Sequence, residues 1–277
     1  MSALPRRLAL LGLLIAAAGP VRAVDSATVV LASTTSVDNS GLLARILPVF
    51  TAQTGIGVRV LALGTGQALA VTARGDADLL LVHDPEAEQR FMAEGHGADR
   101  QEVTWNDFIL VGPATDPAGL AGGRDAPAAL ARIAQARAPF VSRGDNSGTH
   151  AQERRLWRAA GLDPAQAGTS WYRDVGGGMG AALNAAAAIG AYTLSDRGTW
   201  LSFNNKGDLR IVVEGGSALL NRYSVIVPTP ANHRPEGREP ARRLAAWLVS
   251  AEGQSAIGAY TVAGQRLFNP VAVPKPE

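Results

Sequence analysis

The sequence predicts an α/β protein of two lobes, in which lobe 1 is discontinuous and a ligand cleft lies between the lobes. Short apolar runs of strand length alternate with helical patterns along most of the chain. A late strand, 223–228, would carry the chain back toward the lobe in which it began. We therefore expect residues 24–111 and 225–277 to form lobe 1, and residues 112–224 to form lobe 2.

The first 23 residues have the three parts of a cleavable export signal. Arg6 and Arg7 give a positive start, residues 8–18 are apolar and uncharged, and cleavage would follow the small residue Ala23. The apolar run is too short to span a bilayer comfortably. The chain has no cysteine, which excludes a lipid-modified N-terminus, disulfides and thiolate metal sites. We expect a mature periplasmic protein, not inserted in the membrane.

The basic character of the chain belongs largely to this signal. Residues 1–23 contain three arginines and no acidic residue, so their removal changes the formal charge from +2 to −1. This charge gives no indication of a nucleic-acid or membrane-binding surface.

Lobe 1 should open with strands that each run into a helix. Each strand is an apolar run, and the first helix repeats apolar residues at helical spacing. Pro85 suits the first turn of a helix. The expected strands are 27–32, 58–63, 78–82 and 105–111, and the expected helices are 42–50, 68–74 and one that begins at Pro85.

Lobe 2 continues the alternation, and the end of the chain is helical. The expected helices are 128–136, 151–160, 181–189 and 241–249, followed by helical turns over 251–260. The expected strands are 138–141, 171–175, 190–194, 211–214 and the returning strand 223–228.

Four strand-to-helix turns share one chemistry: 33–36, 64–67, 147–149 and 176–180. Each offers hydroxyl groups or glycine backbone where free N–H groups and the positive end of a helix dipole should point outward. Plain helix capping would need only one such residue per turn. In α/β sheets, ligands bind at the carboxyl ends of strands, so two turns from each lobe would form a donor-rich cleft. Such a site suits a small, fully ionised oxyanion.

The stretch 142–150 adds the only guanidinium in these turns. Arg143 would place a planar charge beside the donors of Ser147 and Thr149. Asp145 either pairs with Arg143 or faces the ligand, and the sequence leaves both arrangements open.

Other motifs are incomplete. Residues 64–67 lack the lysine of a nucleotide P-loop, and Leu69 breaks the dinucleotide pattern. His83 lacks a second histidine at ligand spacing and fits a structural turn. Ser147 and His150 occur without a nucleophile elbow or an orienting acid, so we expect no enzyme.

These segments together resemble the periplasmic tungstate-binding component of ABC-type importers. The resemblance covers essentially the mature chain, and the family's Thr-Thr-Thr-Ser signature stands here as Ser33-Thr34-Thr35-Ser36, which keeps every hydroxyl. The other matching segments are 38–43, 64–69, 75–78, 81–88, 106–108, 142–150, 178–180, 191–199, 219–221 and 264–268.

The resemblance implies a class II periplasmic-binding fold that closes on tungstate or molybdate. It implies no cofactor and no metal site, since the oxyanion itself is the ligand. It further implies a monomer that delivers the anion to a permease and its cytoplasmic ATPase. The ligand-binding residues carried over by the resemblance are Thr34, Thr35, Ser36, Thr65, Arg143, Ser147, Gly148, Thr149, Met179, Gly180 and Thr193.

Two alternatives remain at this point. Monohydrogen phosphate carries a proton that Asp145 could accept, so a phosphate receptor is one of them. An oxyanion sensor that contacts a receptor instead of a permease is the other. The choice between tungstate and molybdate also stays open, because the two dianions have nearly the same size.

Overall fold

The computed structural model describes residues 27–145, 147–164 and 170–271, and the signal expected over 1–23 lies outside them. The elements of lobe 1 follow the expected order. They are β1 (Thr28–Thr34), α1 (Thr35–Asn39), α2 (Leu42–Thr54), β2 (Gly57–Leu63), α3 (Thr65–Ala73), β3 (Leu79–Val82), α4 (Pro85–Ala93) and the first part of β4 (Gly97–Pro113).

Lobe 2 inserts between β4 and β9, and the chain then returns to lobe 1. Its elements are α5 (Ala126–Ala136), β5 (Phe140–Ser142), α6 (Gly148–Ala159), β6 (Tyr172–Asp174), α7 (Met179–Ile189), β7 (Tyr192–Asp196), α8 (Arg197–Ser202), β8 (Leu209–Val213) and the short helix η1 (Ser217–Leu219). The closing elements are β9 (Leu220–Pro228), η2 (Pro230–Asn232), α9 (Pro235–Leu248), α10 (Ala251–Gly258), β10 (Thr261–Val262), β11 (Gln265–Arg266) and β12 (Asn269–Pro270).

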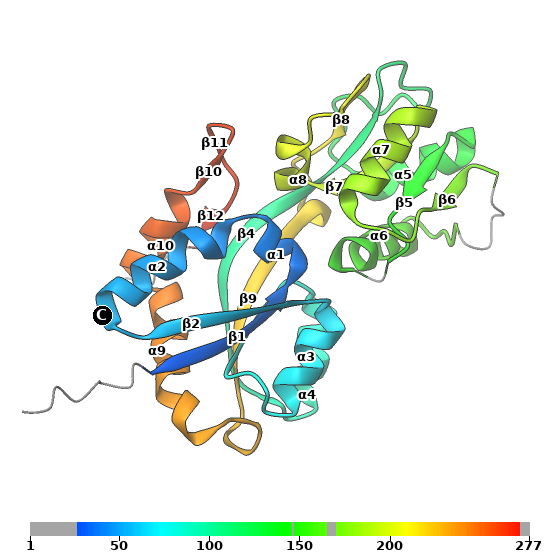
Figure 1. Cartoon of the computed structure of the whole chain (residues 1–277). Coiled ribbons are helices and arrows are strands. Elements are labelled where there is room, and N and C mark those ends of the chain that lie inside the picture. Colours follow the sequence, from blue (N-terminus) through cyan, green and yellow to red (C-terminus); the bar gives the residue numbers. More distant parts are fainter. Residues whose placement is uncertain (1–26, 146, 165–169, 272–277) are drawn as a thin grey trace, which may run out of the picture.

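The strands are joined in the order β2-β1-β3-β9-β4-β7-β5-β6, with β8 and β12 also paired to β4. Figure 1 shows β4 and β9 running from lobe 1 toward lobe 2 as the links between the two halves. β4 is longer than the strand expected over 105–111. Up to Asp107 it pairs with β9, and from Phe108 it pairs with β7 and then β8.

Helices cover both faces of the lobe 1 sheet, and the side chains of β1 show why. Val29 and Leu31 lie in the core under α2 and α9, whereas Val30 and Ala32 lie in a second core under α3. Successive side chains of a strand point to opposite faces, so a strand buried on both faces reads as one continuous apolar run. None of the helices in the described part of the chain combines the length and the apolar character needed to cross a membrane.

Parallel pairing then brings the expected turns together. β1 pairs with β2 so that Thr34 lies opposite Leu63, and β1 pairs with β3 so that Ser33 lies opposite Leu81. The carboxyl ends of these strands therefore meet at one edge, which faces the corresponding edge of lobe 2.

Candidate functional site

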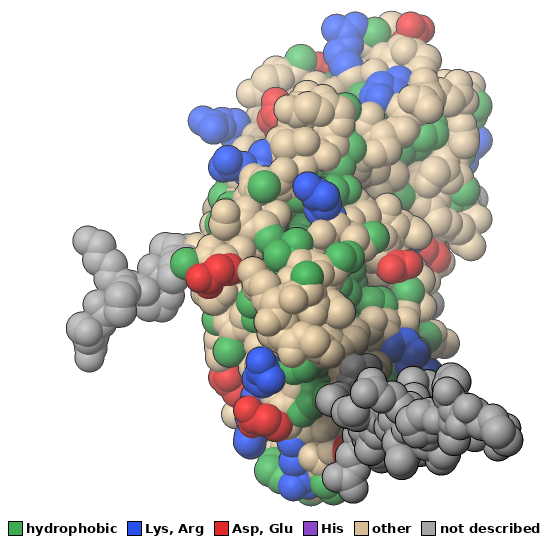
Figure 2. Space-filling view, turned by 60° about the vertical axis from the view of Figure 1, so that its left-hand side comes forward, with side chains coloured by type: hydrophobic (Ala, Val, Ile, Leu, Met, Phe, Trp, Pro, Cys, Tyr) green, Lys and Arg blue, Asp and Glu red, His purple; other side chains and the backbone are tan. Residues whose placement is uncertain are grey.

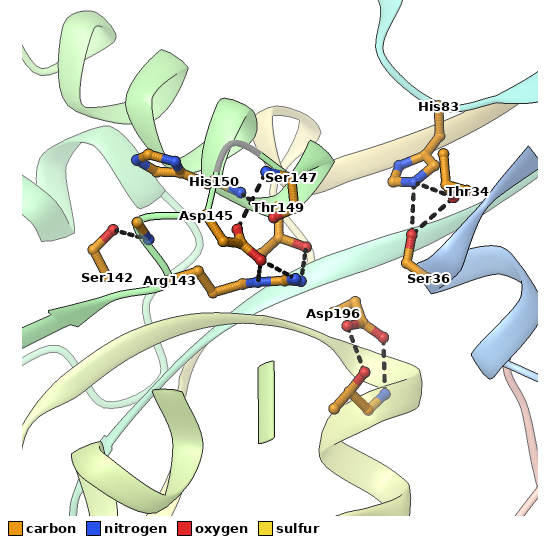
Figure 3. Close-up of polar contacts among 12 residues, drawn as sticks. Thr34, Ser36, His83, Ser142, Arg143, Asp145, Ser147, Thr149, His150 and Asp196 are labelled. Carbon is orange, nitrogen blue, oxygen red and sulfur yellow. Dashed lines mark hydrogen bonds and ion pairs between the residues drawn. The ribbon is translucent and has the colours of Figure 1, made fainter. Parts of the chain in front are cut away.

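A cavity of about 540 Å³ lies between the lobes and is lined by residues of both. Most of the residues implied by the sequence resemblance line it. These are Thr34, Thr35, Ser36, Thr65, Arg143, Ser147, Gly148, Met179 and Gly180. Figure 3 shows Thr34 and Ser36 on one side and the Arg143 loop on the other.

Thr149 and Thr193 do not line this cavity, although both are buried. The Thr149 hydroxyl lies 3.4 Å from Nη1 of Arg143, which donates to it, so this residue supports the arginine from behind. Thr193 lies within β7, in register with Val111 and Val141, and its Oγ1 has no hydrogen-bond partner among the described residues.

On the lobe 1 side, hydroxyl groups gather at the end of β1. Thr34 caps α1 by accepting a hydrogen bond from the Val37 N–H at 3.3 Å, and its hydroxyl lies 2.9 Å from that of Ser36. Next to them, α3 begins at Thr65 after Gly64, which has no side chain to occupy the first N–H groups of the helix. Those N–H groups remain available to a ligand in the cavity.

On the lobe 2 side, two longer helices begin at the cavity. Ser147 caps α6 and accepts a hydrogen bond from the His150 N–H at 3.3 Å. Gly178 is the cap of α7, so Met179 and Gly180 present the start of that helix to the cavity. The dipoles of α6 and α7 both favour negative charge at this place.

Arg143 is held in the cavity wall by Asp145. Nε and Nη2 of Arg143 donate to the same carboxylate oxygen at 3.1 and 2.5 Å, and the other oxygen accepts from the Ser147 N–H at 3.2 Å. Burial acts to raise the pKa of Asp145, but the hydrogen bonds from Ser147 and Arg143 outweigh it, and the pKa lies below its usual range. The carboxylate therefore pairs with Arg143 and stays ionised.

Sequence reasoning did not include several lining residues at the start of α8. Asp196 is the last residue of β7 and caps α8, where it accepts hydrogen bonds from the Thr199 N–H at 2.8 Å and from the Thr199 hydroxyl at 2.7 Å. Gly198 and Ser202 also line the cavity. An acidic residue at a strand end, three residues before a threonine, is a capping pattern and could have located this turn.

Asn39 and Ser40, at the end of α1, were also missed, and Val262 and Leu267 supply an apolar wall from the closing segment. Nothing in the local pattern around Val262 points to the cavity. Its place depends on how the end of the chain packs back onto lobe 1.

His83 was expected in a structural turn, and it does directly follow β3. Its ring, however, lies behind the hydroxyls of the site (Figure 3). Nε2 is 3.0 Å from Ser36 Oγ and 3.2 Å from Thr34 Oγ1. Burial lowers the pKa of His83, which keeps the imidazole neutral.

The geometry defines a class of protein: two α/β lobes linked by two strands, with a donor-lined cavity between them. The model of the PBP superfamily domain matches residues 21–252, and the chain belongs to this superfamily.

More specific relatives share the whole architecture. A tungstate-binding protein TupA of Peptoclostridium acidaminophilum is 44% identical, over 88% of this chain and 86% of that protein. The solved structure of a tungstate-binding protein TupA from Desulfovibrio alaskensis G20 gives a TM-score of 0.81 at 42% identity, covering 89% of this chain and 100% of that chain. The structure of the tungstate ABC transporter from Geobacter sulfurreducens gives 0.74 at 40% identity, covering 84% and 98%. The chain belongs to the same family as these TupA proteins.

Proposed function

We propose that this chain is an extracytoplasmic receptor that binds tungstate, with molybdate as a second ligand, in the cleft between its lobes. The observation that carries the proposal is the hydrogen-bonding character of the cavity wall. The wall offers hydroxyls, N–H groups at helix starts and one guanidinium. A fully ionised oxyanion can use only donors, and its charge is stabilised most by charge-assisted hydrogen bonds. Relatives that bind tungstate support the same ligand here.

The two carboxylates of the wall argue against phosphate. Each oxygen of Asp145 and of Asp196 already accepts a hydrogen bond from the protein. Monohydrogen phosphate would need one of them to accept its proton. An unprotonated dianion avoids this requirement.

The proposed cargo route follows from the family and from the start of the sequence. We assign the permease and cytoplasmic ATPase of an ABC importer as partners, supported by the tungstate ABC transporter among the structural relatives. The signal expected over 1–23 would deliver the receptor to the periplasm, where it acts as a monomer. On the face drawn in Figure 2, positive and negative side chains are interspersed, so this face offers no basic patch for a nucleic acid.

We propose no catalytic role for the site. Ser147 uses its hydroxyl to accept a hydrogen bond from the backbone of His150, which is helix capping. A hydrolase would instead need the hydroxyl proton to be taken by an oriented imidazole. We also propose that the site uses no cofactor.

The moving units are proposed to be the lobes expected from the sequence, 24–111 with 225–277, and 112–224. The exchange of partners along β4, from β9 before Phe108 to β7 and β8 after it, supports a boundary near this point. Closure of the lobes would then bend β4 and β9 near this boundary and leave the hydrophobic cores of each lobe intact.

Calorimetric titration of the mature chain with tungstate, molybdate, sulfate and phosphate tests the proposal. We expect one-to-one binding of tungstate, with molybdate equal or weaker and no heat from phosphate. Binding of phosphate alone would refute the ligand assignment. The absence of binding by any of the four anions would refute the receptor function.

A further inference from the structure

His83 lies where the two sides of the cleft and the two linking strands come together. It is 4% exposed and comes directly after β3. On one side its ring reaches the hydroxyls of Thr34 and Ser36, and on the other Nδ1 lies 3.0 Å from Oδ1 of Asn221 on β9. The ring also stacks on Tyr223, with centroids 4.8 Å apart. These contacts fix the ring in one orientation.

The neighbours of Asn221 determine which ring nitrogen carries the proton. Its Nδ2 donates to Oδ1 of Asn106 at 2.8 Å and to the Tyr223 hydroxyl at 2.7 Å. Its Oδ1 is therefore the atom that faces His83 and accepts a hydrogen bond from Nδ1–H. In a neutral imidazole, Nε2 is then a lone-pair acceptor directed at the two hydroxyls.

This acceptor controls how the hydroxyl protons are arranged. If Thr34 donates to Nε2, the Ser36 proton is free to point into the cavity. If Ser36 donates to Nε2 instead, the Thr34 proton is the one that is free to point into the cavity. The Thr34 oxygen accepts from the Val37 N–H in both cases. In either arrangement Nε2 takes up one of the two protons and leaves the other hydroxyl as a donor for a bound anion.

The same ring also limits the approach of lobe 2. A Cβ atom on Gly148, the first residue of α6, would stand 2.8 Å from Cε1 of His83. A contact this short requires something to move, and the ring is held by its hydrogen bonds and by Tyr223. Only glycine at position 148 allows the start of α6 to rest against the ring.

We propose that His83 is a positioning residue of the anion site, which accepts a hydrogen bond at Nε2 from one hydroxyl of the Thr34–Ser36 pair, leaves the other hydroxyl for the oxyanion and sets the approach of Gly148. The proposal rests on the oxyanion-binding function proposed above. If wild-type protein binds no oxyanion, that function fails. If wild-type protein binds and the variants below do not behave as stated, the role of His83 fails.

Two substitutions separate the acceptor from the rest of the ring. Gln at position 83 can place its oxygen where Nε2 lies, whereas Asn is too short to reach the hydroxyls but still reaches Asn221. We expect His83→Asn to weaken tungstate binding about tenfold, the effect of one lost hydrogen bond, and His83→Gln to stay within about threefold of wild type. Equal losses in both variants, or no loss in either, would overturn the proposal. His96→Gln, the same exchange at a half-exposed histidine outside the cavity, is the matched control.

A double-mutant cycle tests the contact with lobe 2. Gly148→Ala should weaken tungstate binding about tenfold or more in the wild-type background, because the new methyl group meets the ring. In the His83→Asn background the ring is absent, so the same change should cost less than about threefold. Equal losses in the two backgrounds would show that the ring does not set this approach.

Nitrogen NMR of the wild-type imidazoles gives a readout that does not depend on the tungstate affinity of a variant. The chain has four histidines, and loss of one set of signals in His83→Asn assigns the ring. We expect His83 to carry its proton on Nδ1, with Nε2 unprotonated, both before and after tungstate is added. A proton on Nε2 in the tungstate complex would overturn the proposal.

Discussion

Removal of the Arg143 guanidinium should have a larger effect than the loss of one ligand contact. Arg143 and Asp145 are 11% and 19% exposed at their side chains, so the pair is largely shielded from water. Substituting Arg143→Ala removes the cation and leaves the Asp145 carboxylate beside the bound dianion. Two separate penalties follow, and they can be separated by a second substitution.

The first penalty is a lost charge-assisted hydrogen bond, worth about 1.5–3 kcal/mol, or roughly 10- to 150-fold in affinity. The second is repulsion between the unpaired carboxylate and the anion, at least about 1–2 kcal/mol at an effective dielectric constant near 20. Together they predict a loss of about 100-fold or more for Arg143→Ala. The double variant Arg143→Ala/Asp145→Asn keeps only the first penalty and should bind about tenfold more tightly than Arg143→Ala.

Calorimetric titration with tungstate measures both variants directly. Arg45→Ala, at an exposed arginine of α2 outside the cavity, is the matched control and should bind as wild type does. If the double variant binds no better than Arg143→Ala, the repulsion argument is wrong. If Arg143→Ala keeps wild-type affinity, the guanidinium does not contact the anion.

Three further predictions follow from other contacts. Nη1 of Arg155 on α6 lies 2.9 Å from Oδ1 of Asp84, which caps α4 in lobe 1, and both side chains are less than one-fifth exposed. Arg155→Gln should therefore speed tungstate release about 3- to 10-fold in stopped-flow traces. An unchanged release rate would show that the pair does not hold the lobes together. Burial raises the pKa of Glu153 to about 7, above its usual value, so the folded state binds an extra proton and loses stability as the pH rises from about 4.5 to 7. Glu153→Gln keeps an acceptor for the Tyr172 hydroxyl, and its free energy of unfolding in urea titrations should exceed that of wild type by about 2–3 kcal/mol at pH 8.5 but not at pH 4.5. A difference that does not depend on pH would contradict this reasoning. Asp78→Ala removes the buried acceptor of the Val30 N–H and of Arg234, and should lower the free energy of unfolding by about 3 kcal/mol in urea titrations while folded protein keeps its tungstate affinity.

The sequence predicted the strand-to-helix turns well because each one is a local pattern. An apolar run followed by hydroxyls or glycines marks a strand end and a helix start within a few residues. Parallel pairing in register then brings Thr34 beside Leu63 without any further information. The cavity residues at these turns could therefore be located before the structure was known.

The strand β4 was underestimated because its local pattern changes along its length. From Gly97 to Glu102 it is mostly polar and partly or fully exposed, and only from Phe108 onward is every residue buried. The polar part is a strand because β9 pairs with it, and β9 lies more than 100 residues later in the chain. No window of neighbouring residues contains that information.

Which residues of a matching segment reach the cavity could not be predicted from the sequence, because it depends on their positions in the folded strands. Thr193 belongs to a matching segment, but it lies within β7 and does not line the cavity, whereas Asp196 at the strand end does. His83 likewise depends on Asn221, 138 residues away, for its orientation. Long-range pairs of this kind orient the side chains behind the cavity wall, whereas the local strand-to-helix turns supply the wall itself.

The balance of charge in the cavity explains why these orientations matter. Among the described lining residues, the wall carries one guanidinium and the carboxylates of Asp145 and Asp196, so it holds no excess of positive charge. A dianion must therefore be stabilised by hydroxyl and N–H dipoles, each of which contributes only when it points at an oxygen of the ligand. Helix starts fix the N–H groups, Asp145 fixes Arg143, and an acceptor behind Thr34 and Ser36 fixes the hydroxyl protons. Because the fold already holds these donors in place, most of the hydrogen-bond energy would be available to offset the loss of the anion's hydration in the proposed complex.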